Sequence, residues 1–187
     1  MTTESILWRR LDSPGHDACS IAPLGPGHVI SGAAAFLHAG QPAGLAYRLV
    51  CDAAFHSLHG EFHGAIGSRS VRFEIAHTKQ GIWTLNGTSV EGLDGCVDLD
   101  FGFTPATNLT QLRRLALAQG QAGDAPSAWL DLDSAKLTRL EQRYERRSAT
   151  TYWYEAPRFG YAALLEARPS GFILKYPQLW EAELTSP

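Results

Sequence analysis

The chain has 187 residues, of which 44% are hydrophobic and 19% charged, and its formal net charge is −3. This size and hydrophobic content suit a single domain, residues 1–187, with a substantial core. The negative net charge leaves no basic surplus for a phosphate backbone, which argues against general nucleic-acid binding. No stretch has the length and hydrophobicity of a transmembrane segment, and the N-terminus lacks a signal-peptide pattern, so we expect a cytoplasmic protein.

Short runs of alternating apolar and polar residues, separated by turns with Gly and Pro, fill the first half of the chain. This pattern is typical of many short strands. Asn86-Gly87 favours a tight hairpin, because both residues tolerate a positive φ. The strands predicted before residue 95 cover residues 6–11, 16–24, 28–38, 45–52, 55–66, 71–75 and 81–85.

Residues 95–115, GCVDLDFGFTPATNLTQLRRL, form the most distinctive unit of the sequence. Apolar residues at 97, 99, 101 and 103 alternate with polar or small ones, which predicts a strand with one buried face. Asp98 and Asp100 then share the other face. Pro105 ends the strand, because proline has no N–H for the ladder and restricts the residue before it.

A short helix is predicted directly after this proline. Asn108 and Gln111 have the spacing of a capping box, and leucines recur at helical intervals over residues 109–115. At about 100° per residue, Arg113 lies beside this apolar stripe and Arg114 points well away from it. The unit therefore brings two aspartates and two arginines near one another.

Strands are also predicted through the rest of the chain. Residues 115–118 and 128–132 look like a hairpin. Residues 134–147 are ambiguous, because their Glu and Arg content favours a helix, whereas the β-rich run at 150–154 favours a long hairpin; we favour a strand. The remaining predicted strands are residues 160–167, 172–176 and 179–184.

The sequence predicts roughly a dozen strands and one convincing helix. This strand content is well above the usual share in a globular domain. An antiparallel sheet of this extent must curl, close or double over, because flat open sheets seldom exceed about ten strands. The sequence therefore predicts a mainly β protein whose sheet has an interior. Side chains, the short helix or a ligand must fill that interior.

Several motifs can be compared with those of known proteins: Trp83 with Asn86-Gly87, residues 95–100 and 104–108, Arg113-Arg114-Leu115, Gln142-Arg143-Tyr144, Tyr152 with Tyr154, Phe159, Gly171-Phe172 and Tyr176-Pro177. Together they resemble a bacterial family described as putative glycolipid-binding proteins with a spiral β-roll fold. The resemblance implies a large antiparallel sheet curled around a single short α-helix. It also implies a likeness to bacterial lipid and lipoprotein carriers, from which glycolipid binding was proposed. It brings no catalytic residues, and we expect no cofactor.

The favoured hypothesis is a non-enzymatic protein that binds, or binds and carries, a glycolipid or other amphipathic ligand in a cavity between the sheet and the helix. The acyl part would contact inward aliphatic and aromatic side chains, and the headgroup would contact polar groups of the central unit. The candidate ligand-binding residues are Trp83, Asp98, Asp100, Asn108, Arg113, Arg114, Tyr144, Tyr152, Tyr154 and Tyr176.

Two other functions remain open. The first is a small hydrolase or isomerase that uses Asp98 and Asp100 with Arg113 for charge stabilisation; the spacing of the two carboxylates does not decide this. The second is a structural or partner-binding domain in which the aspartates only neutralise the arginines.

Three histidines close in sequence raise the question of a metal site. His56, His59 and His63 would share a face on a helix, but Gly60 and Gly64 argue against a helix there. On a strand the three side chains do not all point the same way, so we expect no metal site.

Overall fold

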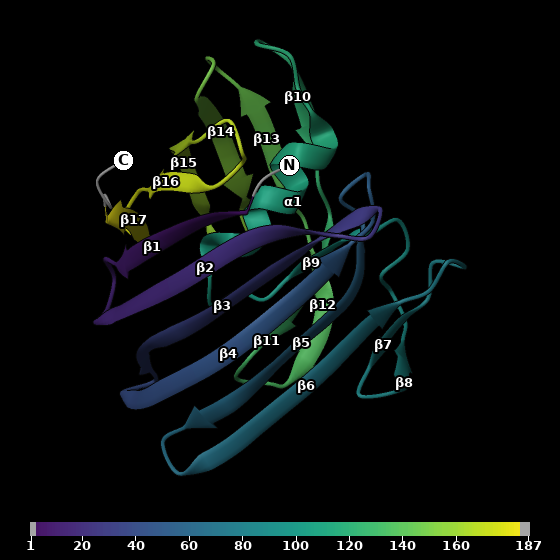
Figure 1. Cartoon of the computed structure of the whole chain (residues 1–187), viewed down its shortest axis with the longest axis vertical. Helices are drawn as coiled ribbons and strands as arrows, with labels where there is room; N and C mark the ends of the chain where they lie inside the picture. Colours follow the sequence, from purple (N-terminus) through teal and green to yellow (C-terminus); the bar gives the residue numbers. More distant parts are fainter. Residues whose placement is uncertain (1–2, 184–187) are drawn as a thin grey trace.

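The computed structural model describes residues 3–183 and shows a mainly β protein with one α-helix in that range (Figure 1). Fourteen strands form a single large antiparallel sheet, and three more form a small second sheet. The predicted fold class, a large antiparallel sheet with one short helix, is confirmed. Residues 1–2 and 184–187, including Leu184 of the last predicted strand, lie outside the described residues.

The first eight strands of the large sheet follow one another as a meander. Each pairs with its neighbour in the chain, and side chains alternate between the concave inner face and the outer face. They are β1 (Glu4–Arg10), β2 (Gly15–Leu24), β3 (Gly27–His38), β4 (Gln41–Cys51), β5 (Ser57–Ile66), β6 (Arg69–His77), β7 (Trp83–Leu85) and β8 (Thr88–Val90).

The second part of the same sheet comes from the C-terminal half of the chain. The last strand pairs with β1, so the two ends of the described chain lie side by side in the sheet. These strands are β10 (Ala122–Asp124), β13 (Arg143–Arg146), β14 (Thr151–Ala156), β15 (Tyr161–Ala167), β16 (Ile173–Tyr176) and β17 (Trp180–Glu183).

The small sheet and the helical segments lie within the bend of the large sheet. In Figure 1, β1–β6 form a broad curved layer, β13–β17 stand above it, and the helix lies between these two parts. The small sheet contains β9 (Asp98–Asp100), β11 (Ser127–Asp131) and β12 (Lys136–Leu140). The helical segments are the 3₁₀ turns η1 (Pro105–Thr107) and η2 (Pro157–Phe159), and α1 (Asn108–Leu115).

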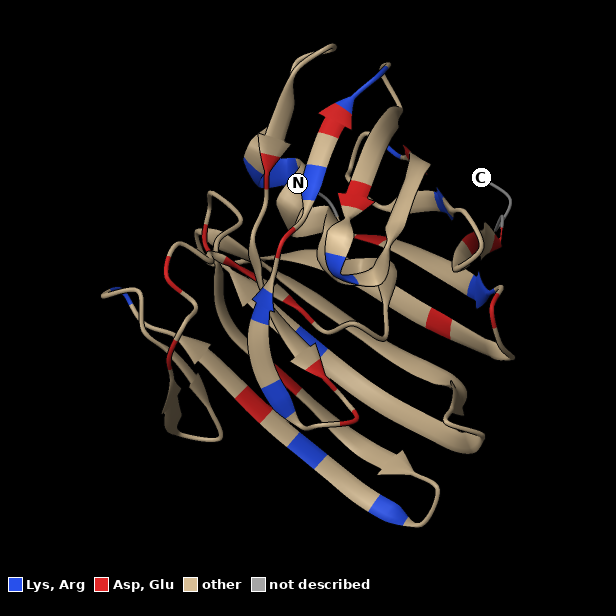
Figure 2. Ribbon diagram, turned by 180° about the vertical axis from the view of Figure 1, so that it is seen from behind, with Lys and Arg blue, Asp and Glu red and all other residues tan. Residues whose placement is uncertain are grey.

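Charged side chains are spread over the whole fold. Figure 2 shows basic and acidic residues interspersed on the strands and the turns rather than separated into two faces. No helix in residues 3–183 combines the length and the apolar character needed to cross a bilayer.

The segment that carries β9 lies across the concave face of the long strands. Leu99 contacts β5, and Phe101 and Phe103 pack against Phe62 with ring centroids 5.7 and 5.2 Å away. All three residues of β9 are buried, because the strand has the sheet on one side and α1 on the other. The prediction that only one face of this strand is buried was therefore wrong.

The structure also corrects the predicted strand pairing after the helix. Residues 122–124 form a strand that pairs with β13, whereas β11 pairs with β12 and runs parallel to β9. The predicted hairpin between residues 115–118 and 128–132 is therefore wrong. Residues 136–140 and 143–146 are strands, as favoured over a helix, but they belong to two different sheets.

Gly60 on β5 leaves the space that Leu99 occupies. A Cβ at Gly60 would collide with Cδ2 of Leu99 and come within 3.2 Å of the Phe101 ring. We predict that Gly60→Ala lowers the free energy of unfolding by about 1–3 kcal/mol, because a packed core cannot absorb the methyl group. Urea unfolding followed by tryptophan fluorescence measures the change.

Gly44 on the neighbouring strand is the matched control. A Cβ there meets nothing within 4 Å, so Gly44→Ala should leave stability unchanged or slightly raised. Equal losses in the two variants would contradict the packing of Leu99 against Gly60.

Candidate functional site

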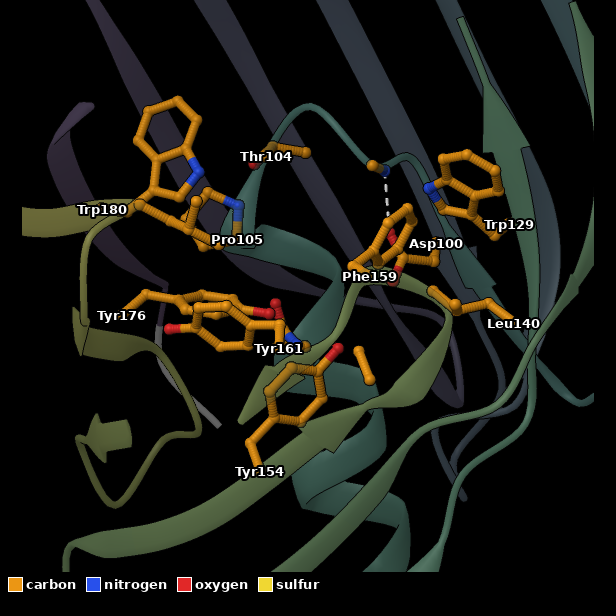
Figure 3. Close-up of a pocket in the computed structure, with 14 residues that line it drawn as sticks. Asp100, Thr104, Pro105, Trp129, Leu140, Tyr154, Phe159, Tyr161, Tyr176 and Trp180 are labelled. Atoms are coloured by element: carbon orange, nitrogen blue, oxygen red, sulfur yellow. Dashed lines mark hydrogen bonds between the residues drawn. The ribbon is translucent and has the colours of Figure 1, made fainter. Parts of the chain in front are cut away.

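A pocket of about 400 Å³ opens beside the start of the helical segment. It lies between the turn before η1, the small sheet and strands β14–β17 (Figure 3). Its volume is in the range of small-molecule sites. Six aromatic side chains line it: Trp129, Tyr154, Phe159, Tyr161, Tyr176 and Trp180.

Five of the six aromatic residues form two groups, and Trp180 lies apart from both. Trp129 and Phe159 meet edge to face, with ring centroids 5.3 Å apart. Three tyrosines form the second group, with centroid separations of 5.4–6.1 Å. In Figure 3, Trp129 and Trp180 lie at opposite sides of the pocket, with the tyrosine rings in between and below. The walls thus offer apolar surface with polar hydroxyl edges.

Asp100 is the charged residue of the lining. It pairs in register with Trp129 across β9 and β11, so both side chains lie on the same face. Its carboxylate accepts hydrogen bonds from the Gly102 N–H at 2.7 Å, the Gln142 amide at 2.7 Å and the Thr107 hydroxyl at 3.5 Å. Burial raises the pKa of Asp100, and these hydrogen bonds act in the opposite direction. No Lys, Arg or His of residues 3–183 lies within 4.0 Å of its oxygens.

Asp98, two residues earlier, is in a different environment. Its side chain is fully buried and accepts from Arg114, with Nε to Oδ2 at 3.0 Å and Nη2 to Oδ2 at 2.5 Å. This carboxylate is therefore already paired within the protein and does not line the pocket.

The sequence predicted that two aspartates and two arginines would lie near one another, but of the two arginines of α1 only Arg114 meets an aspartate. Arg114 turns inward to Asp98, whereas Arg113 is exposed, lies over the Phe55 ring and donates to the Pro169 carbonyl at 3.3 Å. A helical wheel assumes one buried stripe, but α1 is buried on every side from Asn108 to Leu112. The apolar stripe therefore says little about which arginine faces inward.

The predicted capping box is also wrong. The Asn108 amide donates to the Tyr144 hydroxyl at 2.7 Å, and that hydroxyl donates to Gln111. Gln111 in turn donates to Ser127 Oγ at 2.8 Å. The helical segment begins earlier, where Thr104 Oγ1 accepts from the Ala106 N–H at 3.0 Å.

Four of the ten candidate residues line the pocket: Asp100, Asn108, Tyr154 and Tyr176. The other six do not: Trp83, Asp98, Arg113, Arg114, Tyr144 and Tyr152. Trp83 is buried elsewhere, where its indole N–H donates to the Cys96 carbonyl at 3.0 Å. The aromatic lining residues that sequence reasoning missed as ligand contacts are Trp129, Phe159, Tyr161 and Trp180. They come from separate strands and turns, so no local spacing connects them to the motif at residues 95–115.

The three clustered histidines are dispersed. His56 contacts Asp52 at 2.9 Å, His59 contacts Glu74 at 3.3 Å, and His63 lies on the outer face beside Arg72. Within residues 3–183 no group of three or more metal-ligand side chains comes together.

A buried acidic group on β2 holds the turn that forms one wall of the pocket. Asp17 is inaccessible to solvent and accepts hydrogen bonds from the Tyr47 hydroxyl at 2.9 Å and from the Thr104 hydroxyl. Thr104 and Pro105 line the pocket, so this contact ties the wall to β2 and β4. An aspartate at an inward position of an otherwise apolar strand face was the available sequence signal.

Two comparisons with known proteins give a match, one to a family and one to a solved structure. The sequence matches the family described as Putative glycolipid-binding over residues 5–182. The fold is similar to the crystal structure of a DUF1089 family protein from Pseudomonas aeruginosa, with a TM-score of 0.71 and 26% sequence identity. That similarity covers 97% of this chain and 92% of the other. No curated protein matches the sequence.

Arg114 neutralises the buried carboxylate of Asp98. Arg114→Met removes the charge and keeps most of the stem, so it leaves a buried carboxylate without its cation. We expect the free energy of unfolding to fall by about 3 kcal/mol. Arg113→Met, one residue away, should cost much less because that side chain is exposed. Chemical denaturation measures both variants. If Arg114→Met and Arg113→Met lower the free energy of unfolding by similar amounts, the ion pair does not stabilise α1.

The stability of the protein should depend on pH through Asp17. Burial raises the pKa of Asp17 to about 6 from 3.8, so between these values the native state binds the proton more tightly than the unfolded state. Protonated Asp17 therefore contributes to the free energy of unfolding. The contribution is complete below the pKa that Asp17 has in the unfolded state, and it is lost as the pH rises through its pKa in the folded state. Between pH 4 and 7 it should decline by about 2 kcal/mol.

Asp17→Asn removes the titrating carboxyl group. The variant should therefore lack the decline in stability that Asp17 causes between pH 4 and 7. The wild-type protein should lose stability relative to the variant as the pH of urea unfolding rises from 4 to 7. Parallel stability curves for the two proteins would contradict the assigned pKa.

Proposed function

The chain belongs to the Putative glycolipid-binding family, and from that premise we propose that it binds a glycolipid or other amphipathic molecule without transforming it. The observation that carries this proposal is the pocket beside η1, with its aromatic walls and few polar groups. Ligand sites are typically concave, mostly apolar and equipped with a few polar groups that fix orientation. The pocket has all three properties.

The position of the polar groups suggests how such a ligand would lie. Asp100 and Asn108 are at the inner side, on the segment that enters the sheet, and Phe159 is 53% exposed at the rim. We expect the polar end of the ligand to contact Asp100 and Asn108. Its apolar part would then contact Trp129, Phe159 and the facing aromatic rings.

The arrangement of the acidic residues gives no support to a hydrolase or isomerase built on an aspartate pair. Asp98 is bonded to Arg114, and Arg113 lies on the exposed side of α1. Of the three residues that such a mechanism would need, only Asp100 faces the pocket.

Native mass spectrometry and lipid extraction test the proposal. We expect the purified protein to carry an amphiphile that is released on denaturation. Phe159→Ala should lower its occupancy several-fold, because the ring covers the rim and is exposed enough to be removed without loss of folding. Trp153→Ala is the control, since Trp153 is an aromatic residue of β14 outside the pocket lining. A protein that neither co-purifies with an amphiphile nor binds any added octyl amphiphile, whether its headgroup is neutral, cationic or anionic, would refute the proposal.

A further inference from the structure

Asp100 is a buried carboxylate without a cation beside it. Its residue is 8% exposed, and its three hydrogen bonds come from neutral donors. Asp98, on the same short strand, has the guanidinium of Arg114 at 2.5 Å. A buried charge is costly unless it is paired. Asp98 has a cationic partner and Asp100 does not, so we look for a cationic partner of Asp100 outside the protein.

The pocket itself contains no such partner. Its lining holds one carboxylate and no Lys, Arg or His, so its formal charge is negative. Two arginines lie over aromatic residues of the pocket without being part of its lining: Arg158 over Trp129, where it donates to the Thr138 hydroxyl, and Arg10 over Trp180, where it pairs with Asp12. An anionic headgroup inside the pocket would therefore meet Asp100, the one charged group of the lining, in a site of low dielectric.

The geometry around Asp100 suits a cationic group. Oδ2 accepts one hydrogen bond, from Gln142, and a carboxylate oxygen can accept two. Asn108 turns its amide nitrogen to Tyr144, which leaves the amide oxygen as a second acceptor in the lining. Trp129 lies beside Asp100 in register, and the faces of Trp and Tyr rings attract ammonium groups.

We propose that this pocket binds a protonated amine, which is the polar end of the amphipathic ligand. This inference rests on the proposed function and narrows its ligand class. The ammonium group donates to Asp100 and Asn108 and neutralises the buried carboxylate, while neighbouring aromatic rings surround it. Neutral hydroxyl groups would satisfy the acceptors but leave the charge of Asp100 without a counter-ion.

Three amphiphiles that share an octyl tail and differ in headgroup test the amine assignment: octylammonium, octyl β-glucoside and octyl sulfate. Each is titrated into the protein by calorimetry at pH 7, below its critical micelle concentration. Octylammonium should bind the wild-type protein about tenfold more tightly than octyl glucoside, and octyl sulfate should bind most weakly. Asp100→Asn should abolish the preference for the amine. Asp124→Asn, an exposed residue on β10 outside the pocket lining, should keep it.

The ranking on the wild-type protein decides the proposal even if Asp100→Asn does not fold. Octyl glucoside binding as tightly as octylammonium, or more tightly, would overturn the amine assignment and leave the proposed function intact. Failure of all three probes to bind, together with the absence of a co-purified amphiphile, would overturn both. A preference for octyl sulfate would overturn the charge argument.

Discussion

Burial of the segment from Cys96 to Asn108 inside the curled sheet is the constraint on which the rest of this structure depends. A buried strand and turn bring polar side chains into a region without bulk water, and each needs a partner there. Three of the partners, Asp17, Gln142 and Tyr144, lie at β2 or β13 and are distant along the chain, so this segment connects the two parts of the sheet. The connections are Asp98 with Arg114, Asp100 with Gln142, Thr104 with Asp17, and Asn108 with Tyr144.

These connections also shape the pocket that we propose as the ligand site. Asp98 is neutralised by α1 and serves stability, whereas Asp100 is bonded only to neutral donors and faces a space between aromatic walls. Two carboxylates on one short strand therefore have separate roles, and their neighbours decide which role each has. We infer that the unpaired charge gives the pocket its chemical preference.

Much of the fold could be predicted from alternating hydrophobicity, because inward and outward positions repeat every second residue along β1–β6. Sequence reasoning failed where pairing is non-local, as for β9 and β11, which run parallel to each other although 29 positions separate partners such as Asp98 and Ser127 along the chain. For the site, the motif at residues 95–115 identified Asp100 and Asn108. It did not identify Trp129, Phe159 and Trp180, because these lining residues come from separate strands and turns that meet only through the curvature of the sheet.

The five tryptophans provide the most direct test of the central claim, that an amphipathic ligand binds between Trp129 and Trp180. Each indole N–H gives one resolved signal in a ¹H–¹⁵N NMR spectrum, and three of the five residues, Trp8, Trp83 and Trp153, do not line the pocket. Titration with an alkyl ligand should shift the Trp129 and Trp180 signals and leave the other three in place. Shifts centred on Trp153, or none at saturating ligand, would contradict this account.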